Sequence, residues 1–125
     1  MSQSLLIVED EASIREPLAS YFERNQFRVK EAASAAEART LLAAHAFDLV
    51  ISDIMMPGED GLSLCRHIRE TSNLPVILLT AKRMNKDVVE GFHLGATDYI
   101  VKPFMPDEVV ARAMRALGFK ETGRP

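Results

Sequence analysis

Short apolar runs alternate with longer amphipathic stretches along the chain, and this order constrains the fold more than any other feature. The apolar runs predict five strands: Leu5–Val8, Phe27–Glu31, Leu49–Ile51, Val76–Leu79 and Tyr99–Val101. The longer stretches predict five helices: Ser13–Arg24, Ala35–Ala44, Gly61–Glu70, Asp87–Leu94 and Pro106–Leu117. Strands that are apolar on both faces require helices on both faces of a parallel sheet. Because crossovers between parallel strands are right-handed, the sequence predicts a doubly wound α/β domain.

The composition is that of an ordinary globular domain. Apolar residues make up 47% and charged residues 26% of the 125 residues, and the formal net charge is −3. This acidic balance argues against direct binding to nucleic acid, which requires a basic face. The single cysteine, Cys65, excludes an intrachain disulfide and indicates a reducing compartment. No apolar run approaches the roughly 20 residues of a membrane span, so we expect a cytoplasmic protein that does not contact the membrane.

Charged and hydroxyl side chains follow four of the predicted strands at or near the point where each strand ends. Glu9 and Asp10 follow the first strand, and Asp53 comes soon after the third. Thr80 follows the fourth strand, and Lys102 follows the fifth. In doubly wound sheets, ligands bind at the carboxyl ends of the strands, next to the point where the strand order reverses. We therefore expect these five side chains to converge at one edge of the sheet.

Three carboxylates near one ammonium and one hydroxyl indicate phosphoryl chemistry. Neighbouring carboxylates repel one another, and Mg²⁺ binds clustered oxygen ligands while leaving room for phosphate oxygens. Because an aspartate can accept a phosphoryl group covalently, we predict Asp53 as the acceptor. Lys102 would neutralise the developing charge, and Thr80 would donate a hydrogen bond to a phosphoryl oxygen. Any one of these residues alone would more often be a helix cap, turn residue or surface charge; their joint placement at strand ends favours an active site.

At these positions the chain closely resembles the receiver domains of bacterial two-component response regulators. The motifs that carry the resemblance are Ile7-Val8-Glu9-Asp10-Glu11, Asp53-Ile54-Met55-Met56-Pro57-Gly58 with Asp60-Gly61, Leu79-Thr80-Ala81, and Gly95-Ala96 through Asp98-Tyr99 to Lys102-Pro103-Phe104. They extend over nearly the whole chain, from Leu5 to about Leu117. The last motif is most similar to the subfamily in which the receiver precedes a winged-helix DNA-binding domain.

The resemblance implies a flavodoxin-like three-layer sandwich with strand order 2-1-3-4-5 and five helices. The receiver would occupy residues 1–117, and residues 118–125 would form a tail or the start of a linker to an output domain that this sequence lacks. DNA would be contacted only through such an output domain. A sensor histidine kinase would be the phosphodonor, and the output would be transcription.

The resemblance also implies the metal ligands. Asp10 and Asp53 would bind Mg²⁺ directly, together with the backbone carbonyl of Met55, and Glu9 would act through water. Mn²⁺ is the alternative cation. Asp53 would take its phosphoryl group from a phosphohistidine of the kinase, and the domain would be a signalling switch rather than an enzyme, assisting only its own phosphorylation and slow dephosphorylation.

Two further features follow from the same resemblance. Thr80 and Tyr99 match the switch pair, in which the hydroxyl moves toward the phosphoryl group while the aromatic ring turns inward. Phosphorylation would thereby shift the population between two packings of the fourth helix and fifth strand. The Lys102–Pro103 peptide bond would be cis, which proline makes accessible.

The surface formed by the fourth helix, fifth strand and fifth helix would pair active homodimers. Asp98, Glu108, Arg112 and Arg115 stand at the acidic and basic places of that surface. On the fourth helix, the usual basic partner of Glu108 is replaced by Val88. Exposed ion pairs contribute little individually, so the loss of one need not abolish association.

Three other functions compete with this interpretation. A hydrolase with an aspartyl-phosphate intermediate would need a second carboxylate where Met55 stands. A flavodoxin-like cofactor carrier would need a glycine- and hydroxyl-rich loop after the first strand, and Glu9, Asp10 and Glu11 would repel a phosphate there. A module that works without phosphorylation typically lacks one of the site residues, and all are present. A freestanding receiver that acts through protein–protein interaction remains the alternative within the family.

The remaining polar and methionine residues carry no predicted chemistry. His45, His67 and His93 fall on separate predicted helices without metal-ligand spacing, so we expect them on solvated helix surfaces. Apart from the Met55 carbonyl, Met55 and Met56 are expected to cover the edge of the sheet.

Overall fold

The structure is a computed structural model of the chain, and it describes residues 3–81 and 93–118. Its five strands are β1 (Gln3–Val8), β2 (Phe27–Ala32), β3 (Leu49–Asp53), β4 (Val76–Thr80) and β5 (Asp98–Val101). The helices in the described residues are α1 (Ala12–Arg24), α2 (Ala35–Ala44), α3 (Gly61–Thr71) and α5 (Pro106–Ala116), and none of these four is long and apolar enough to cross a membrane. The predicted helix over Asp87–Leu94, including Val88, falls almost wholly outside the described residues, as does most of the expected tail.

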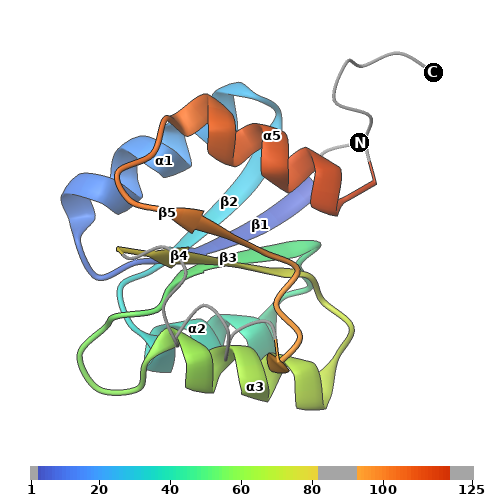
Figure 1. Cartoon of the computed structure of the whole chain (residues 1–125). Coiled ribbons are helices and arrows are strands. Elements are labelled where there is room, and N and C mark those ends of the chain that lie inside the picture. Colours follow the sequence, from blue (N-terminus) through green and yellow to red (C-terminus); the bar gives the residue numbers. More distant parts are fainter. Residues whose placement is uncertain (1–2, 82–92, 119–125) are drawn as a thin grey trace.

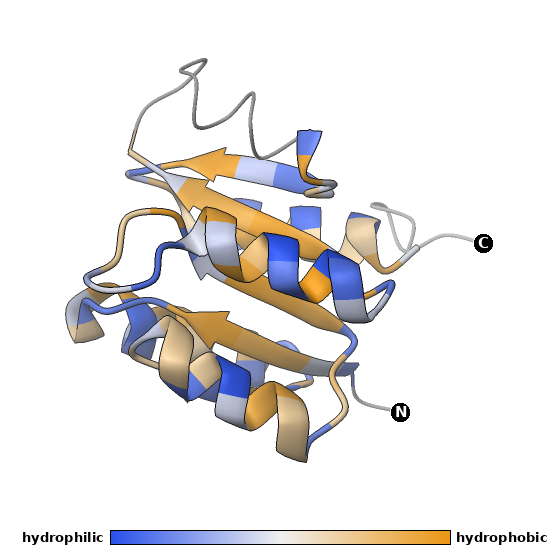
Figure 2. Ribbon diagram, turned by 90° about the horizontal axis from the view of Figure 1, so that it is seen from below, coloured by the Kyte–Doolittle hydropathy of each residue, from blue (hydrophilic) through white to orange (hydrophobic). Residues whose placement is uncertain are grey.

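All strand pairs are parallel, and the sheet has the order β2-β1-β3-β4-β5. This confirms the strand order that the resemblance to receiver domains implies. Helices α1 and α5 lie on one face of the sheet, while α2 and α3 lie on the other (Figure 1). The strands are mostly apolar and the helices are of mixed hydropathy, as expected for a sheet enclosed between two helical layers (Figure 2).

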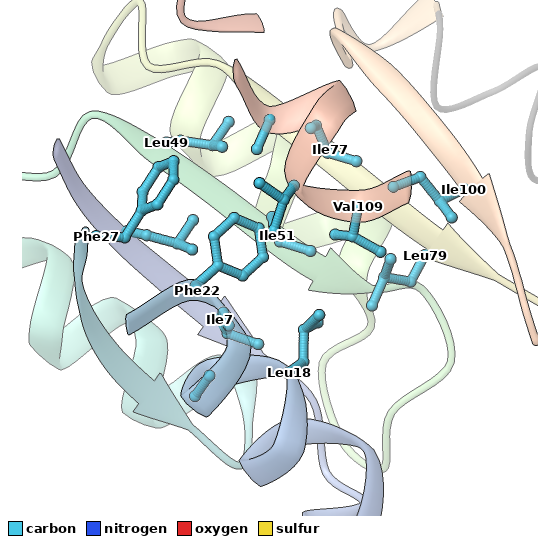
Figure 3. Packing of buried hydrophobic residues seen from close by; sticks show 14 residues of the cluster. Ile7, Leu18, Phe22, Phe27, Leu49, Ile51, Ile77, Leu79, Ile100 and Val109 are labelled. Carbon is cyan, nitrogen blue, oxygen red and sulfur yellow. The ribbon is translucent and has the colours of Figure 1, made fainter. Parts of the chain in front are cut away.

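Successive residues of the strands enter two separate cores. In β1, Leu5 belongs to the core under α1 and α5, whereas Leu6 belongs to the core under α2 and α3. In the first core, the rings of Phe22 and Phe27 meet edge to face with their centroids 4.9 Å apart (Figure 3). The two-residue period of the strands thus divides the apolar side chains between the two faces of the sheet.

All five strands extend further than the sequence predicts, and in β3 and β4 the extension reaches a residue of the predicted phosphorylation site. We predicted ends at Ile51 and Leu79, but β3 continues through Asp53 and β4 continues through Thr80. Both polar residues are only 4% exposed because they belong to the sheet itself. The local backbone geometry of these two site residues is therefore fixed by strand hydrogen bonds rather than by a loop.

Candidate active site at the carboxyl edge of the sheet

The register of the strands brings the predicted site residues together. The last residue of β1 pairs with Ser52, which places Glu9 next to Asp53. Asp53 pairs with the penultimate residue of β4, and Thr80 is the last residue of that strand. Lys102 directly follows β5, and its backbone amide donates to the carbonyl of Thr80 at 2.7 Å.

The acidic and basic side chains are in direct contact at this edge. One carboxylate oxygen each from Glu9, Asp10 and Asp53 lies within 4.8 Å of the others. The ammonium of Lys102 donates to Asp53 Oδ2 at 3.0 Å and lies 2.8 Å from Glu9 Oε1. The second contact is an ion pair. Two buried carboxylates therefore share one cation.

Burial and charge act in opposite directions on this group. Burial raises the pKa of Glu9 above its ordinary value, and the nearby Lys102 ammonium offsets only part of that shift. Burial alone would lower the pKa of Lys102, but its contacts with Glu9 and Asp53 outweigh that effect and raise the pKa. The site therefore keeps its ammonium charged and remains short of positive charge for its three carboxylates.

Two further residues contact the backbone around the site, and of these only Gly61 belongs to a motif found in the sequence. Arg15 on α1 donates from Nη1 to the carbonyl of Glu9 at 2.7 Å and from Nε to Glu31 at 3.0 Å. Gly61, the first residue of α3, leaves no room for a side chain, because a Cβ there would lie 2.1 Å from the carbonyl oxygen of Asp53. The Asp60-Gly61 dipeptide is a sequence signal for this close approach. No such signal exists for Arg15, because it contacts a backbone carbonyl and the side chain of Glu31 on β2.

The donor set fits a hard divalent cation. Carboxylate oxygens are the ligands that Mg²⁺ prefers, and it accepts one or two carboxylates together with waters. Asp10 is the most exposed of the three acidic residues, while Glu9 is fully buried and Asp53 nearly so. A cation here would have protein oxygens on its inner side and an open approach from solvent, which leaves coordination positions for a phosphoryl group.

A known protein family matches most of the chain. The response regulator receiver domain matches residues 5–114. The chain belongs to the response regulator receiver domain family. The transcriptional regulatory protein ResD of Bacillus subtilis is 46% identical over 113 residues, which are 90% of this chain and 47% of that protein. The transcriptional regulatory protein SrrA of Staphylococcus aureus is 44% identical over 117 residues, 94% of this chain and 48% of that protein.

This receiver therefore spans about half the length of the curated relatives that it matches. Among solved structures, the chemotaxis response regulator CheY4 of Vibrio cholerae superposes with a TM-score of 0.88 at 29% identity. That match covers 93% of this chain and 99% of the CheY4 chain. The strand order and the two helical layers described above are thus those of a receiver.

The residues proposed as the switch lie on neighbouring strands of the receiver. Thr80 ends β4 and pairs with Val101 of β5, and Tyr99 stands two residues earlier on β5. Tyr99 is half-buried and packs against the core under α2 and α3. The Lys102–Pro103 peptide bond, which follows β5, is cis.

The residues of the predicted dimer surface bind one another within the receiver. Arg112 lies 3.0 Å from Asp98 Oδ1 and 3.3 Å from Glu108 Oε2. Arg115 is exposed on α5, in a shallow hollow of about 430 Å³ that Glu108 and Arg112 also line. Val88, the departure on the predicted fourth helix, lies outside the described residues.

Two expectations about individual side chains are wrong. His67 is half-buried rather than solvated, because its Nδ1 lies 3.0 Å from Arg39 Nη1 on α2. Met55 is 67% exposed and does not cover the sheet edge, whereas Met56 is buried in the core under α2 and α3. The sequence also gave no signal for Glu59, which binds Arg39 through both carboxylate oxygens.

Proposed function

We propose that this receiver is a phosphorylation-driven switch in which Asp53 accepts a phosphoryl group from a sensor histidine kinase. The observation that carries this proposal is a nearly buried aspartate at a strand end, with two further carboxylates and a shared ammonium around it. A buried carboxylate that only stabilised the fold would be matched by its own cation. Here the acidic groups outnumber the cation, which suits a site that takes up Mg²⁺ and a phosphoryl group.

Transfer to Asp53 is an in-line displacement. A carboxylate oxygen of Asp53 forms a bond to phosphorus as the bond from phosphorus to the imidazole nitrogen of the phosphohistidine breaks, and the electron pair stays on that nitrogen. Bound Mg²⁺, held by Asp10, Asp53 and the Met55 carbonyl with Glu9 acting through water, would neutralise charge on the phosphoryl oxygens.

The protein's own groups contribute positive charge and hydrogen bonding to the same step. The Lys102 ammonium, 3.0 Å from Asp53 Oδ2, stabilises charge that moves onto the phosphoryl oxygens. The hydroxyl of Thr80 donates to a phosphoryl oxygen after transfer. This new contact, together with inward packing of Tyr99, favours the active packing of the surface around β5.

Chemical phosphorylation tests the assignment of Asp53. Incubation with acetyl phosphate and Mg²⁺ should add one phosphoryl mass in an acid-stable, base-labile form, measured by intact mass spectrometry. Asp53→Asn should not gain this mass, and chelation of Mg²⁺ should prevent it in the wild type. The assignment is wrong if the Asp53→Asn protein is modified to the wild-type extent under the same conditions.

We further propose that phosphorylation promotes a homodimer through the surface of β5 and α5. The clustered charges of Asp98, Glu108, Arg112 and Arg115 support this proposal, because pairs now formed within one chain can exchange for pairs between two chains. Beryllofluoride, a stable phosphoryl analogue, should raise the dimer fraction in analytical sedimentation. A protein that stays monomeric with beryllofluoride would contradict the dimer proposal and leave the role of Asp53 intact.

Transcription control is the proposed output, because ResD and SrrA are transcriptional regulatory proteins of about twice this length. The second candidate is a freestanding receiver that acts through protein–protein contacts, which the coverage of 99% of the CheY4 chain favours. A DNA-binding measurement on the product of the complete gene separates the two. Tighter binding after phosphorylation supports a transcription factor, and no binding in either state supports the freestanding receiver.

A further inference from the structure

The side chain of Arg39 joins α2 to the loop that leads from Asp53 into α3. Its Nε donates to Glu59 Oε1 at 2.8 Å, and its Nη2 donates to Glu59 Oε2 at 2.6 Å. The two parallel bonds match the planar fork of a guanidinium to the two oxygens of a carboxylate, which gives this pair a defined orientation. We call Arg39, Glu59, Ser63 and His67 the Arg39 clamp.

The other two members of the clamp belong to α3 and hold the pair in place. Ser63 Oγ donates to Glu59 Oε2 at 2.7 Å. The third nitrogen of the guanidinium, Arg39 Nη1, lies 3.0 Å from His67 Nδ1. Hydrogen bonding to Arg39 lowers the pKa of Glu59 to about 2, so Glu59 is a carboxylate at neutral pH. The clamp therefore fixes Glu59 from two different helices.

Glu59 lies in the short loop whose two ends are attached to the proposed phosphorylation site. At the first end, the amide of Ile54 donates to the carbonyl of Leu79 at 3.0 Å. At the other end, the amide of Gly61 donates to the carbonyl of Ile54 at 2.9 Å, and Gly61 lies against the Asp53 backbone. A displacement of Glu59 would therefore be transmitted along a loop of only a few residues.

Met55, the proposed metal ligand in this loop, is not anchored by its own side chain. Met55, whose carbonyl is assigned to Mg²⁺ above, has 67% of its residue surface exposed. Gly58, between Met55 and Glu59, has a positive φ of 79° and no atom near its missing Cβ. The conformation of this stretch thus depends on its attachments, the buried Met56 on one side and Glu59 on the other.

We propose that Arg39 is a positioning residue for the Mg²⁺ site: through Glu59 it holds the loop that carries the Met55 carbonyl in its binding conformation. This inference rests on the proposed function, because it takes Met55 as a metal ligand. Without the clamp, the loop samples other conformations, and metal binding then includes the cost of ordering it. Groups that contact a metal ligand directly are typically worth about 10- to 100-fold in affinity, and Arg39 acts one step further away.

Calorimetric titration with Mg²⁺ alone tests the proposal. Arg39→Ala should bind Mg²⁺ several-fold more weakly than the wild type. This loss is smaller than the roughly tenfold minimum expected for a group that contacts a metal ligand directly. Arg39→Lys keeps the charge without the two-pronged geometry and should restore part of the affinity. Arg66→Ala is the matched control: it removes the same charge from an exposed position on α3, and it should bind Mg²⁺ as the wild type does.

A double-mutant cycle tests whether Arg39 acts through Glu59. If it does, Arg39→Ala combined with Glu59→Ala should weaken binding less than the sum of the single changes. Amide hydrogen exchange of residues 55, 56 and 58–60 in metal-free protein should be faster in Arg39→Ala. If Arg39→Ala unfolds, Arg39→Lys and Glu59→Gln provide the same comparison.

Two results would overturn the proposal: unchanged Mg²⁺ affinity in folded Arg39→Ala, or strictly additive effects of the two single changes. Its failure is distinguishable from failure of the proposed function. A wild-type protein that neither binds Mg²⁺ nor gains a phosphoryl group refutes the switch itself. If the wild type binds Mg²⁺ and is phosphorylated, and Arg39→Ala binds Mg²⁺ with the same affinity, only the role of Arg39 is refuted.

Discussion

Two groups of carboxylates and cations stand at opposite ends of the loop between β3 and α3, and they differ in how their charges balance. At the strand ends, Glu9 and Asp53 share the single ammonium of Lys102, and Asp10 lies beside them. In the Arg39 clamp, one carboxylate has a guanidinium for itself and a hydroxyl in addition.

The pKa of the acidic residue shifts in opposite directions in the two groups, and the balance of charges explains why. Glu9 is fully buried, and its pKa is raised because burial outweighs the shared ammonium. Glu59 keeps partial contact with solvent, and its pKa is lowered to about 2 chiefly by the hydrogen bonds from its own arginine. The same kinds of side chain thus form a site that lacks positive charge at one end of the loop and a satisfied structural contact at the other.

Removal of the shared cation should have the largest effect on stability. Lys102→Met leaves two buried carboxylates without their ammonium, so we expect a loss of about 3 kcal/mol in the free energy of unfolding at pH 7. The loss should shrink at pH 5, where a carboxylate can take up a proton. Urea denaturation at both pH values measures this, and adding Asp53→Asn to the variant should recover part of the loss. An equal loss at both pH values would contradict the charge imbalance.

A substitution in the loop between β3 and α3 should reduce the free energy of unfolding nearly as much. Gly61→Ala places a Cβ 2.1 Å from the carbonyl oxygen of Asp53, so the backbone must shift, at a cost of about 2 kcal/mol. Gly58→Ala is the control in the same loop: it meets no atom and bears only the cost of its positive φ, about 1 kcal/mol. Thermal or urea unfolding compares the two variants. Equal losses would mean that the close approach to Asp53 is not what requires Gly61.

The clamp should show a smaller effect that disappears in acid. Glu59→Gln should lose about 1 kcal/mol at pH 7, the upper end of the range for partly exposed pairs, because the geometry is two-pronged. The folded-state pKa of Glu59, about 2, lies below its ordinary value of 4.5. Its contribution is therefore present above about pH 4.5 and is lost as the pH falls toward 2. Denaturation of wild type and variant across this range measures the effect; a difference that persists at pH 2 would contradict it.

We expect the smallest effect, with the opposite dependence on pH, for Glu9→Gln in metal-free protein. Because the folded-state pKa of Glu9 is raised, the folded wild type holds its proton more tightly than the unfolded chain does. Wild-type stability should therefore fall, relative to the variant, as the pH rises above about 4.5. The same denaturation series with a chelator present measures this difference. If the stability difference between wild type and Glu9→Gln changed with pH in the same direction as that between wild type and Glu59→Gln, the contrast between the two groups would be refuted.

The strand-end group could be predicted from the sequence because each member stands within two residues of the end of an apolar run. A parallel sheet brings all such positions to one edge whatever the distance along the chain, so Glu9, Asp53 and Lys102 were found without knowledge of the register. The reach of β3 and β4 was underestimated, because the apolar pattern stops before Asp53 and Thr80 while the strand hydrogen bonds continue.

The Arg39 clamp could not be predicted in this way. Arg39 and Glu59 are 20 residues apart, and Arg39 and His67 are 28 apart. They meet only because α2 and α3 pack side by side on the same face of the sheet (Figure 1). Helical periodicity identifies the outer face of a helix but not which polar residues of two neighbouring helices will touch. The same limitation explains why His67 was expected in solvent.

The strand order has a consequence for the growing chain. Because β1 lies inside the sheet and β3, β4 and β5 are added outward from it in the order of the sequence, each later strand finds its partner already synthesised. Domains fold as units with the N-terminal part emerging first from the ribosome, so Glu9, Asp10 and Asp53 exist before Lys102 does. Addition of β5 brings the only ammonium among the described residues that pairs with these carboxylates. The lysine that follows β5, the last strand of this sheet along the chain, therefore relieves the repulsion among the carboxylates at the ends of β1 and β3.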